Sequence, residues 1–137
     1  MTRSCARHEQ GIKMVNNNEI MEQVEKMCGK VILLDNGWIH FVYHNYHYIN
    51  IPDSRNGFVR FTIPHLARSC DYSKNKLESV VNETNREVKY VKVVILANGS
   101  IALNYDHKII GEEKAKDVVP HMIKALDAAS MHLFSKL

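Results

Sequence analysis

The chain has 137 residues, of which 45% are hydrophobic and 24% are charged. This length and composition are those of one globular domain, and they exclude a disordered or fibrous chain. The net charge of +3, from 18 basic and 15 acidic residues, is too small to indicate a nucleic-acid-binding protein.

The sequence contains no targeting signal that we recognise. The N-terminal residues lack the apolar run of a signal peptide, and no stretch approaches the roughly 18 apolar residues of a membrane span. Cys5, Cys28 and Cys70 are odd in number and form no CxxC pair, so neither a disulfide framework nor a zinc site is expected. We therefore expect a cytoplasmic protein that does not bind membranes.

The first element expected is a helix that follows a flexible arm. Residues 1–16 show no periodicity and are expected to form this arm, so that residues 17–137 make up a single domain. Ile20, Val24 and Met27 then recur at helical spacing. Asn17 or Asn18 is the expected N-cap, and Gly29 is the expected stop.

A strand-rich block follows this helix. Two β-rich runs flank Asn36-Gly37, a dipeptide that tolerates the positive φ angles of a tight hairpin turn. A third strand is expected over residues 46–51. A fourth is expected over residues 58–63, closed by Pro64.

The second half of the chain repeats this alternation. A helix is expected over residues 73–87, and a hairpin around Asn98-Gly99 pairs residues 88–96 with 100–105. A long apolar helix starts near residue 112. Either Pro120 kinks this helix, or the helix starts only near Val119 with Pro120 in its first turn. The order predicts an α+β domain, with an antiparallel sheet of about five to six strands and three helices (α-β-β-β-β-α-β-β-α).

This order resembles the YbjN family, which has the fold of the type III secretion chaperones. The resemblance covers nearly everything after residue 17. It rests on the strand-rich block, on the segment NETNREVKYVKVVILANGSIALNY over residues 82–105, and on the apolar final helix. It implies a small cytoplasmic protein, often a homodimer, that acts as a regulator or chaperone-like binder. It implies neither enzyme activity nor a cofactor.

The alternation of side chains predicts which residues share a face of the sheet. A two-residue turn at Asn36-Gly37 pairs Leu34 with Ile39 and Ile32 with Phe41. The opposite face then carries the candidate binding residues Val31, Leu33, Trp38, His40 and Val42.

The same parity in the second hairpin puts Val94, Leu96, Ile101 and Leu103 on one side. The other side carries Val91, Val93, Ile95 and Ala102. Because both faces of both hairpins are apolar, we expect that a second copy of the chain covers what its own helices leave exposed. Trp38 either lies at such an interface or packs under the chain's own final helix.

The histidines suggest an alternative function, a small metal- or ligand-dependent enzyme. His44 and His47 could approach each other across a turn at Asn45, with His65 or Asp53 as further ligands. No metal-binding spacing supports this site, so we interpret these residues as polar strand and turn positions, with no metal and no catalytic residues. His40 is too far along the strand from His44 to share an ion with it.

Aromatic residues concentrate in the expected strands. Their likeness to sheets that stack nucleic-acid bases is faint, because such residues in strands more often form core or cross-strand pairs. The residues concerned are Tyr43, Tyr46, Tyr48, Phe58 and Phe61. The sequence therefore favours a non-enzymatic protein-binding module, chaperone-like or regulatory, that forms a homodimer and binds no nucleic acid.

Overall fold

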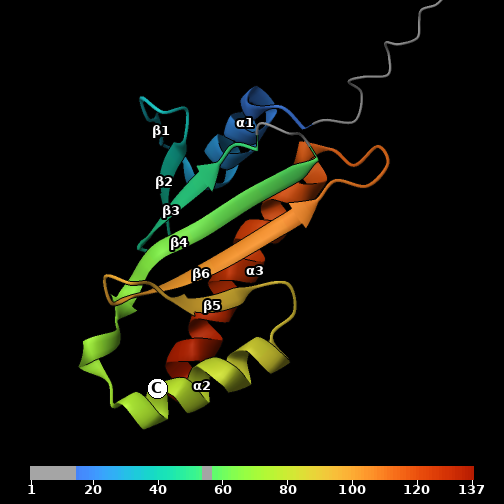
Figure 1. Cartoon of the computed structure of the whole chain (residues 1–137). Helices are drawn as coiled ribbons and strands as arrows, with labels where there is room; N and C mark the ends of the chain where they lie inside the picture. The colour runs from blue at the N-terminus through green and yellow to red at the C-terminus, as the bar shows by residue number, and fades with distance from the viewer. Residues whose placement is uncertain (1–14, 54–56) are drawn as a thin grey trace, which may run out of the picture.

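The structure, a computed structural model, describes residues 15–53 and 57–137 (Figure 1). Its helices and strands follow the predicted order, so the α+β assignment is confirmed. The elements are α1 (Asn17–Cys28), β1 (Val31–Leu33), β2 (Ile39–Tyr43), β3 (Tyr46–Ile51), β4 (Phe58–Arg68), a short 3₁₀ helix (Ser69–Asp71), α2 (Lys74–Glu87), β5 (Lys92–Ile95), β6 (Ser100–Lys108) and α3 (Ala115–Lys136).

The six strands form one antiparallel sheet in the order β1-β2-β3-β4-β6-β5. All three helices are associated with one face of this sheet. α1 packs on β1 and β2, α3 on β4 and β6, and α2 on β5, while α3 also contacts the other two helices. In Figure 1, α1 and α3 lie behind the sheet. The face toward the viewer, which we call the open face, is covered by none of the described elements.

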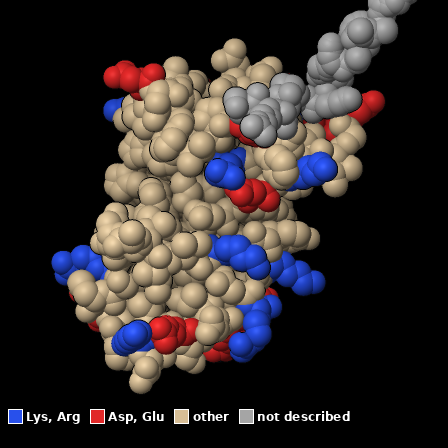
Figure 2. All heavy atoms as spheres, viewed as in Figure 1, with Lys and Arg blue, Asp and Glu red and all other residues tan. Residues whose placement is uncertain are grey.

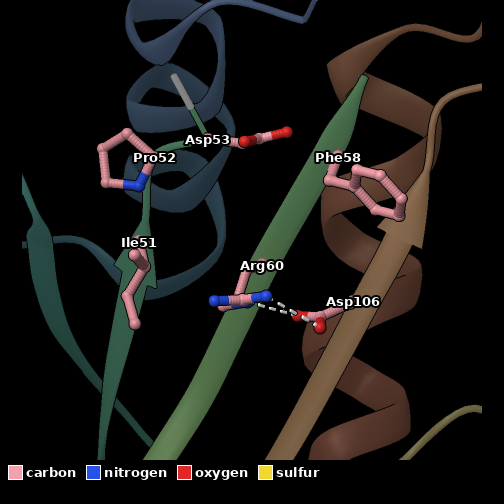
Figure 3. A pocket seen from close by; sticks show the side chains of 6 residues that line it. All are labelled: Ile51, Pro52, Asp53, Phe58, Arg60 and Asp106. Carbon is pink, nitrogen blue, oxygen red and sulfur yellow. Dashed lines mark hydrogen bonds and ion pairs between the residues drawn. The ribbon is translucent and has the colours of Figure 1, made fainter. Parts of the chain in front are cut away.

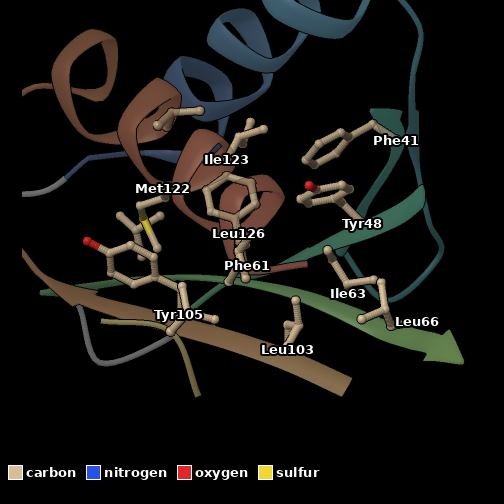
Figure 4. Packing of buried hydrophobic residues seen from close by; sticks show 14 of the residues in the cluster. Phe41, Tyr48, Phe61, Ile63, Leu66, Leu103, Tyr105, Met122, Ile123 and Leu126 are labelled. Carbon is tan, nitrogen blue, oxygen red and sulfur yellow. The ribbon is translucent and has the colours of Figure 1, made fainter. Parts of the chain in front are cut away.

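The core lies between the sheet and the long helix α3 (Figure 4). Phe41 stacks on Tyr48 at 5.1 Å between ring centroids and meets Phe61 edge-on at 5.8 Å. Two residues of α3 are fully buried in this core, Leu126 near Phe61 and Met122 beside Tyr105.

The predicted packing role of the aromatic residues holds for four of the five. Tyr48 and Phe61 are fully buried, and Tyr43 and Tyr46 are partly buried against the core. Phe58 is the exception, since its ring is exposed.

The N-cap of α1 is Asn16, so the predicted cap at Asn17 or Asn18 is wrong by one or two residues. Asn16 is favoured as the N-cap because Glu19 follows it by three residues and completes a capping box. The Asn16 Oδ1 accepts from the Glu19 N–H at 2.9 Å, and the Glu19 carboxylate accepts from the Asn16 N–H at 3.1 Å. Most of the expected arm lies outside the described residues, although Val15 packs against the core.

Two prolines sit inside elements that were expected to end or begin near them. β4 continues past Pro64 to Arg68, and its pairing with β6 shifts register between Ile63 and Ala67. This irregularity accommodates a residue that cannot donate to the ladder. α3 begins at Ala115, so Pro120 lies in its second turn, and the predicted start near Val119 is wrong.

The predicted register of the first hairpin is wrong, although its turn is in the right place. The Leu34 N–H donates to the Trp38 carbonyl at 2.8 Å, so three residues rather than two form the loop. Gly37 closes this loop with φ +89°, the left-handed conformation that follows a type I turn in three-residue hairpins. Leu33 therefore pairs with Ile39, and Val31 pairs with Phe41.

The second hairpin is built in the same way, so its predicted faces are also wrong. The Leu96 N–H donates to the Ser100 carbonyl at 2.8 Å, and Gly99 has φ +90°. Ile95 pairs with Ile101, which places these residues with Val93 and Leu103 on the helix-covered face. Val94 and Ala102 lie on the open face.

Candidate protein-binding surface

The open face carries an apolar cluster where β1 and β2 meet. Ile32, Trp38 and Val42 expose 42%, 37% and 43% of their surface. We call these three residues, together with His40 and His47 between them, the open-face patch. Figure 2 shows that charged side chains are sparse over β1–β3 on this side of the molecule. Trp38 does not pack under α3, so that sequence-based alternative is wrong.

The corrected register divides the predicted binding residues between two faces. Trp38, His40 and Val42 share the open face as expected, because they alternate with the buried Ile39 and Phe41. Two others differ: Val31 packs against the helix-covered core, and Leu33 lies on that same side but is 60% exposed at the sheet edge.

Ile32 is the patch residue that sequence reasoning assigned to the wrong face. Its Cα pairs with that of His40, an open-face residue. The signal that determines this pairing is the length of the loop at Gly37, which the Asn-Gly dipeptide does not specify.

Two histidines form the polar centre of the patch. His40 Nε2 and His47 Nδ1 lie 2.9 Å apart and share a hydrogen bond across β2 and β3, with nearly parallel rings. A hydrogen bond between two imidazole nitrogens needs one of them as acceptor, so at least one of the two rings is neutral in this arrangement. The pair therefore offers polar ring edges without the charge of two imidazolium groups.

The side chains of the candidate metal ligands lie in separate places. His44 Nδ1 donates to the Asp127 carboxylate of α3 at 3.0 Å, on the helix-covered side, whereas His47 lies on the open face. His65 Nδ1 and the Ser100 hydroxyl share a hydrogen bond of 2.7 Å. Within residues 15–53 and 57–137, no three side chains of the metal-ligating types gather around one point.

An ion pair and a shallow hollow lie on the open face where β3 ends and β4 begins (Figure 3). The Arg60 guanidinium donates twice to the Asp106 carboxylate, at 2.6 and 3.1 Å, across β4 and β6. The hydrogen bond and the negative charge of Asp106 raise the Arg60 pKa above its usual value. Phe58 borders the hollow, whose volume is about 260 Å³. The charges of Arg60 and Asp106 compensate each other, and Asp53 adds a further carboxylate to the lining of the hollow.

The two edges of the sheet differ in how their backbone groups are satisfied. Because Leu34 is hydrogen-bonded to Trp38, the alternation of an antiparallel ladder directs the N–H and C=O of Leu33 away from β2. At the opposite edge, the Asn85 side chain bonds both the N–H of Val93 (2.7 Å) and its carbonyl (3.1 Å). The β5 edge is thus bonded at Val93, whereas among the described residues no side chain bonds the outward groups of Leu33 in β1.

Comparison with known proteins identifies the fold rather than a family. Neither a protein-family model nor a curated protein matches the chain. Its structure is similar to a chain in the solved structure of the HopA1-SchA chaperone–effector complex, with a TM-score of 0.58. The fold is chaperone-like, as predicted. The match covers 86% of this chain and 89% of the other at 7% sequence identity, so the likeness concerns the fold alone.

The comparisons leave the resemblance to the YbjN family a prediction, since no family model matches. Among the described residues, no helix combines the length and apolar character needed to cross a bilayer.

Proposed function

We propose that the chain is a non-enzymatic, chaperone-like protein-binding module of the cytoplasm that forms a homodimer. The open-face patch and the neighbouring β1 edge are its contact surface. The observation that carries this proposal is that Ile32, Trp38 and Val42 are exposed on a sheet face that none of the described elements covers, next to the edge strand β1. Similarity to a chain of a chaperone–effector complex supports it.

The energetics of the patch favour a protein ligand. Burial of about 400 Å² of apolar surface contributes on the order of 10 kcal/mol before the entropic costs of association. Trp38 supplies a large rigid side chain of the type enriched in binding hot spots. The hydrogen-bonded pair of His40 and His47 adds polar groups that a partner's backbone can satisfy.

A second copy of the chain is the first partner that this surface fits. Two β1 edges paired antiparallel place the same residues opposite each other, as a two-fold symmetric interface requires. Leu33 of each copy then provides the free N–H and C=O groups for the new ladder, and its exposed side chain is covered.

Light scattering on the purified protein tests the dimer. We expect the wild-type chain to be a dimer at tens of micromolar. Trp38→Ala should weaken the association about tenfold or more while circular dichroism still shows a folded chain, because the indole is outside the core. Met131→Ala removes an exposed apolar side chain from α3 and is the matched control, for which no change is expected.

A wild-type chain that is monomeric at these concentrations contradicts the homodimer. Binding of another protein is then tested separately, by cross-linking in native extract with the wild-type chain, Trp38→Ala and Met131→Ala. A partner that is lost only with Trp38→Ala supports the patch as its docking surface. A partner that is retained equally by all three variants places the contact elsewhere on the molecule.

A further inference from the structure

A second hollow lies on the helix-covered side of the molecule, where the link between α2 and β5 meets β6 and the start of α3. Its volume is about 240 Å³. Aromatic rings and carboxylates predominate in its wall, and neither Lys nor Arg contributes to it. The lining residues are Tyr90, Tyr105, His107, Glu113, Asp117, Val118 and His121.

Four rings give this hollow walls at nearly right angles. Tyr90 and Tyr105 are stacked in parallel, with centroids 5.7 Å apart and planes within 6°. His121 stands across both of them, at 75° to Tyr90 and 81° to Tyr105. His107 stands at 70° to Tyr105. Tyr105 is only 2% exposed, so the ring surface that a ligand can reach belongs mainly to the exposed Tyr90 and His121.

Tyr90 is held in an unusual conformation to complete this arrangement. Its φ of +73° lies in the left-handed region that bulky residues rarely adopt. Its side chain is 64% exposed, so burial in the core does not account for the strain. The contacts it does make are with the rings of Tyr105 and His121, which form the same hollow.

Glu113 supplies negative charge at a defined position. The Ile110 N–H and the His107 Nε2–H both donate to its Oε1 atom, at 2.8 and 2.9 Å. These bonds lower the Glu113 pKa and keep the carboxylate ionised. Its Oε2 atom takes part in neither bond. Asp117, in the first turn of α3, adds a second carboxylate to the lining.

We propose that this hollow binds an alkylated ammonium group, of the kind found in choline or trimethyllysine. Neutral aromatic faces attract such cations through their quadrupole, and nearby carboxylates complement the charge. The Tyr105 phenol stays neutral, because burial raises its pKa.

The geometry favours an ammonium head group over a guanidinium. An arginine fork prefers two carboxylate oxygens at once, but Oε1 of Glu113 already accepts two hydrogen bonds. The hollow is also smaller than the roughly 300–1,000 Å³ of pockets for drug-sized ligands, so it suits a head group. This site is independent of the proposed function, since it shares no residue with the open-face patch or the β1 edge.

A titration of the full chain with choline, followed by amide NMR shifts at constant pH and ionic strength, tests the proposal. We expect saturable shifts confined to residues around the hollow. The neutral isostere 3,3-dimethylbutanol has the same shape without the charge, and it should produce no such shifts. Equal shifts with both compounds, or none with choline, overturn the proposal.

Two variants test the lining in different ways. Tyr90→Ala removes an exposed ring, and Glu113→Gln keeps the shape of the side chain and its capacity to accept both hydrogen bonds. Each should weaken choline binding about threefold or more. Phe58→Ala removes an exposed ring from the open face and should bind choline as the wild type does. Unchanged binding by both lining variants, with the fold intact, overturns the site.

The source of the ammonium group is distinguished by a second ligand. A short peptide with one trimethyllysine is compared with the same peptide carrying unmodified lysine. Binding of the methylated peptide much more tightly than choline identifies a protein side chain as the natural ligand. Equal affinity for choline and the methylated peptide identifies a free small molecule.

Discussion

The two hairpins at opposite ends of the sheet have the same turn and different surroundings. Each follows the pattern Leu-X-Asn-Gly, and in each the glycine closes a three-residue loop at φ near +90°. In the second hairpin, α2 packs on β5, and Asn85 closes its outer edge. In the first, Ile32 and Leu33 of β1 remain exposed. In the second, Ile95 and Leu96 beside the turn are exposed as well, but Val91 and Val93 are buried. Local sequence thus builds the hairpin, but distant elements decide whether it becomes core or contact surface.

The largest expected effect is on the free energy of unfolding, and it is measured with one substitution in each hairpin. Ile101→Ala in β6 empties a fully buried site and should lower the free energy of unfolding by about 2–5 kcal/mol. Ile32→Ala in β1 should cost less than about 1 kcal/mol in the monomer, because its side chain is already in contact with water. Urea denaturation measures both. Equal losses contradict the difference in burial.

The turns themselves are predictable because Asn-Gly has a strong and local physical signature. Glycine at positive φ is free of the steric cost that other residues incur, so Asn36-Gly37 and Asn98-Gly99 mark hairpins in any surroundings. Loop length is a weaker signal. The dipeptide suggests a two-residue turn where three residues form the loop, and this difference exchanges the faces of Ile32 and Leu33.

The second expected effect concerns the protected edge. Asn85→Ala removes both hydrogen bonds to the Val93 backbone and leaves those groups unpaired in a partly buried place. This should cost about 1–3 kcal/mol in the free energy of unfolding. Asn82→Ala, at an exposed position of the same helix, is the control and should cost far less.

Asn85→Ala should also make the β5 edge available for pairing, as the β1 edge is in the wild type. Stronger self-association by light scattering is the expected sign. A variant as stable as Asn82→Ala, with unchanged association, would show that Asn85 does not protect this edge.

The smallest expected effect concerns the turns. Gly37→Val and Gly99→Val should each lower the free energy of unfolding by roughly 1–2 kcal/mol, because a β-branched residue resists the left-handed conformation. The two variants should cost similar amounts, because a Cβ added at Gly99 would lie at an ordinary contact distance of 3.5 Å from the Ser69 hydroxyl, and one added at Gly37 would meet nothing within 4 Å. Gly37→Asn tolerates this conformation and should be milder. Denaturant midpoints equal to wild type for both valine variants contradict the turn assignment.

The candidate sites depend on information that a short window of sequence does not contain. Helical periodicity shows that a helix has an apolar side. It does not show which face of the sheet that side covers, so the sequence does not predict which of the two faces the described helices leave open. The ammonium-binding hollow joins Tyr90, Tyr105 and His121, which are brought together by the packing of α3 on β6 and by the pairing of β5 with β6. Neither residue type nor spacing marks such a site in the sequence.

The three-residue loop before Trp38 also affects how the exposed residues of β1 can change in evolution. The strand it positions, Val31–Leu33, is apolar at every position, so its side chains do not distinguish inside from outside. Deletion of one loop residue reverses which of them face the helices, and insertion of one does the same. A change in loop length is therefore a single genetic event that exchanges the exposed residues of β1 without any substitution in the strand.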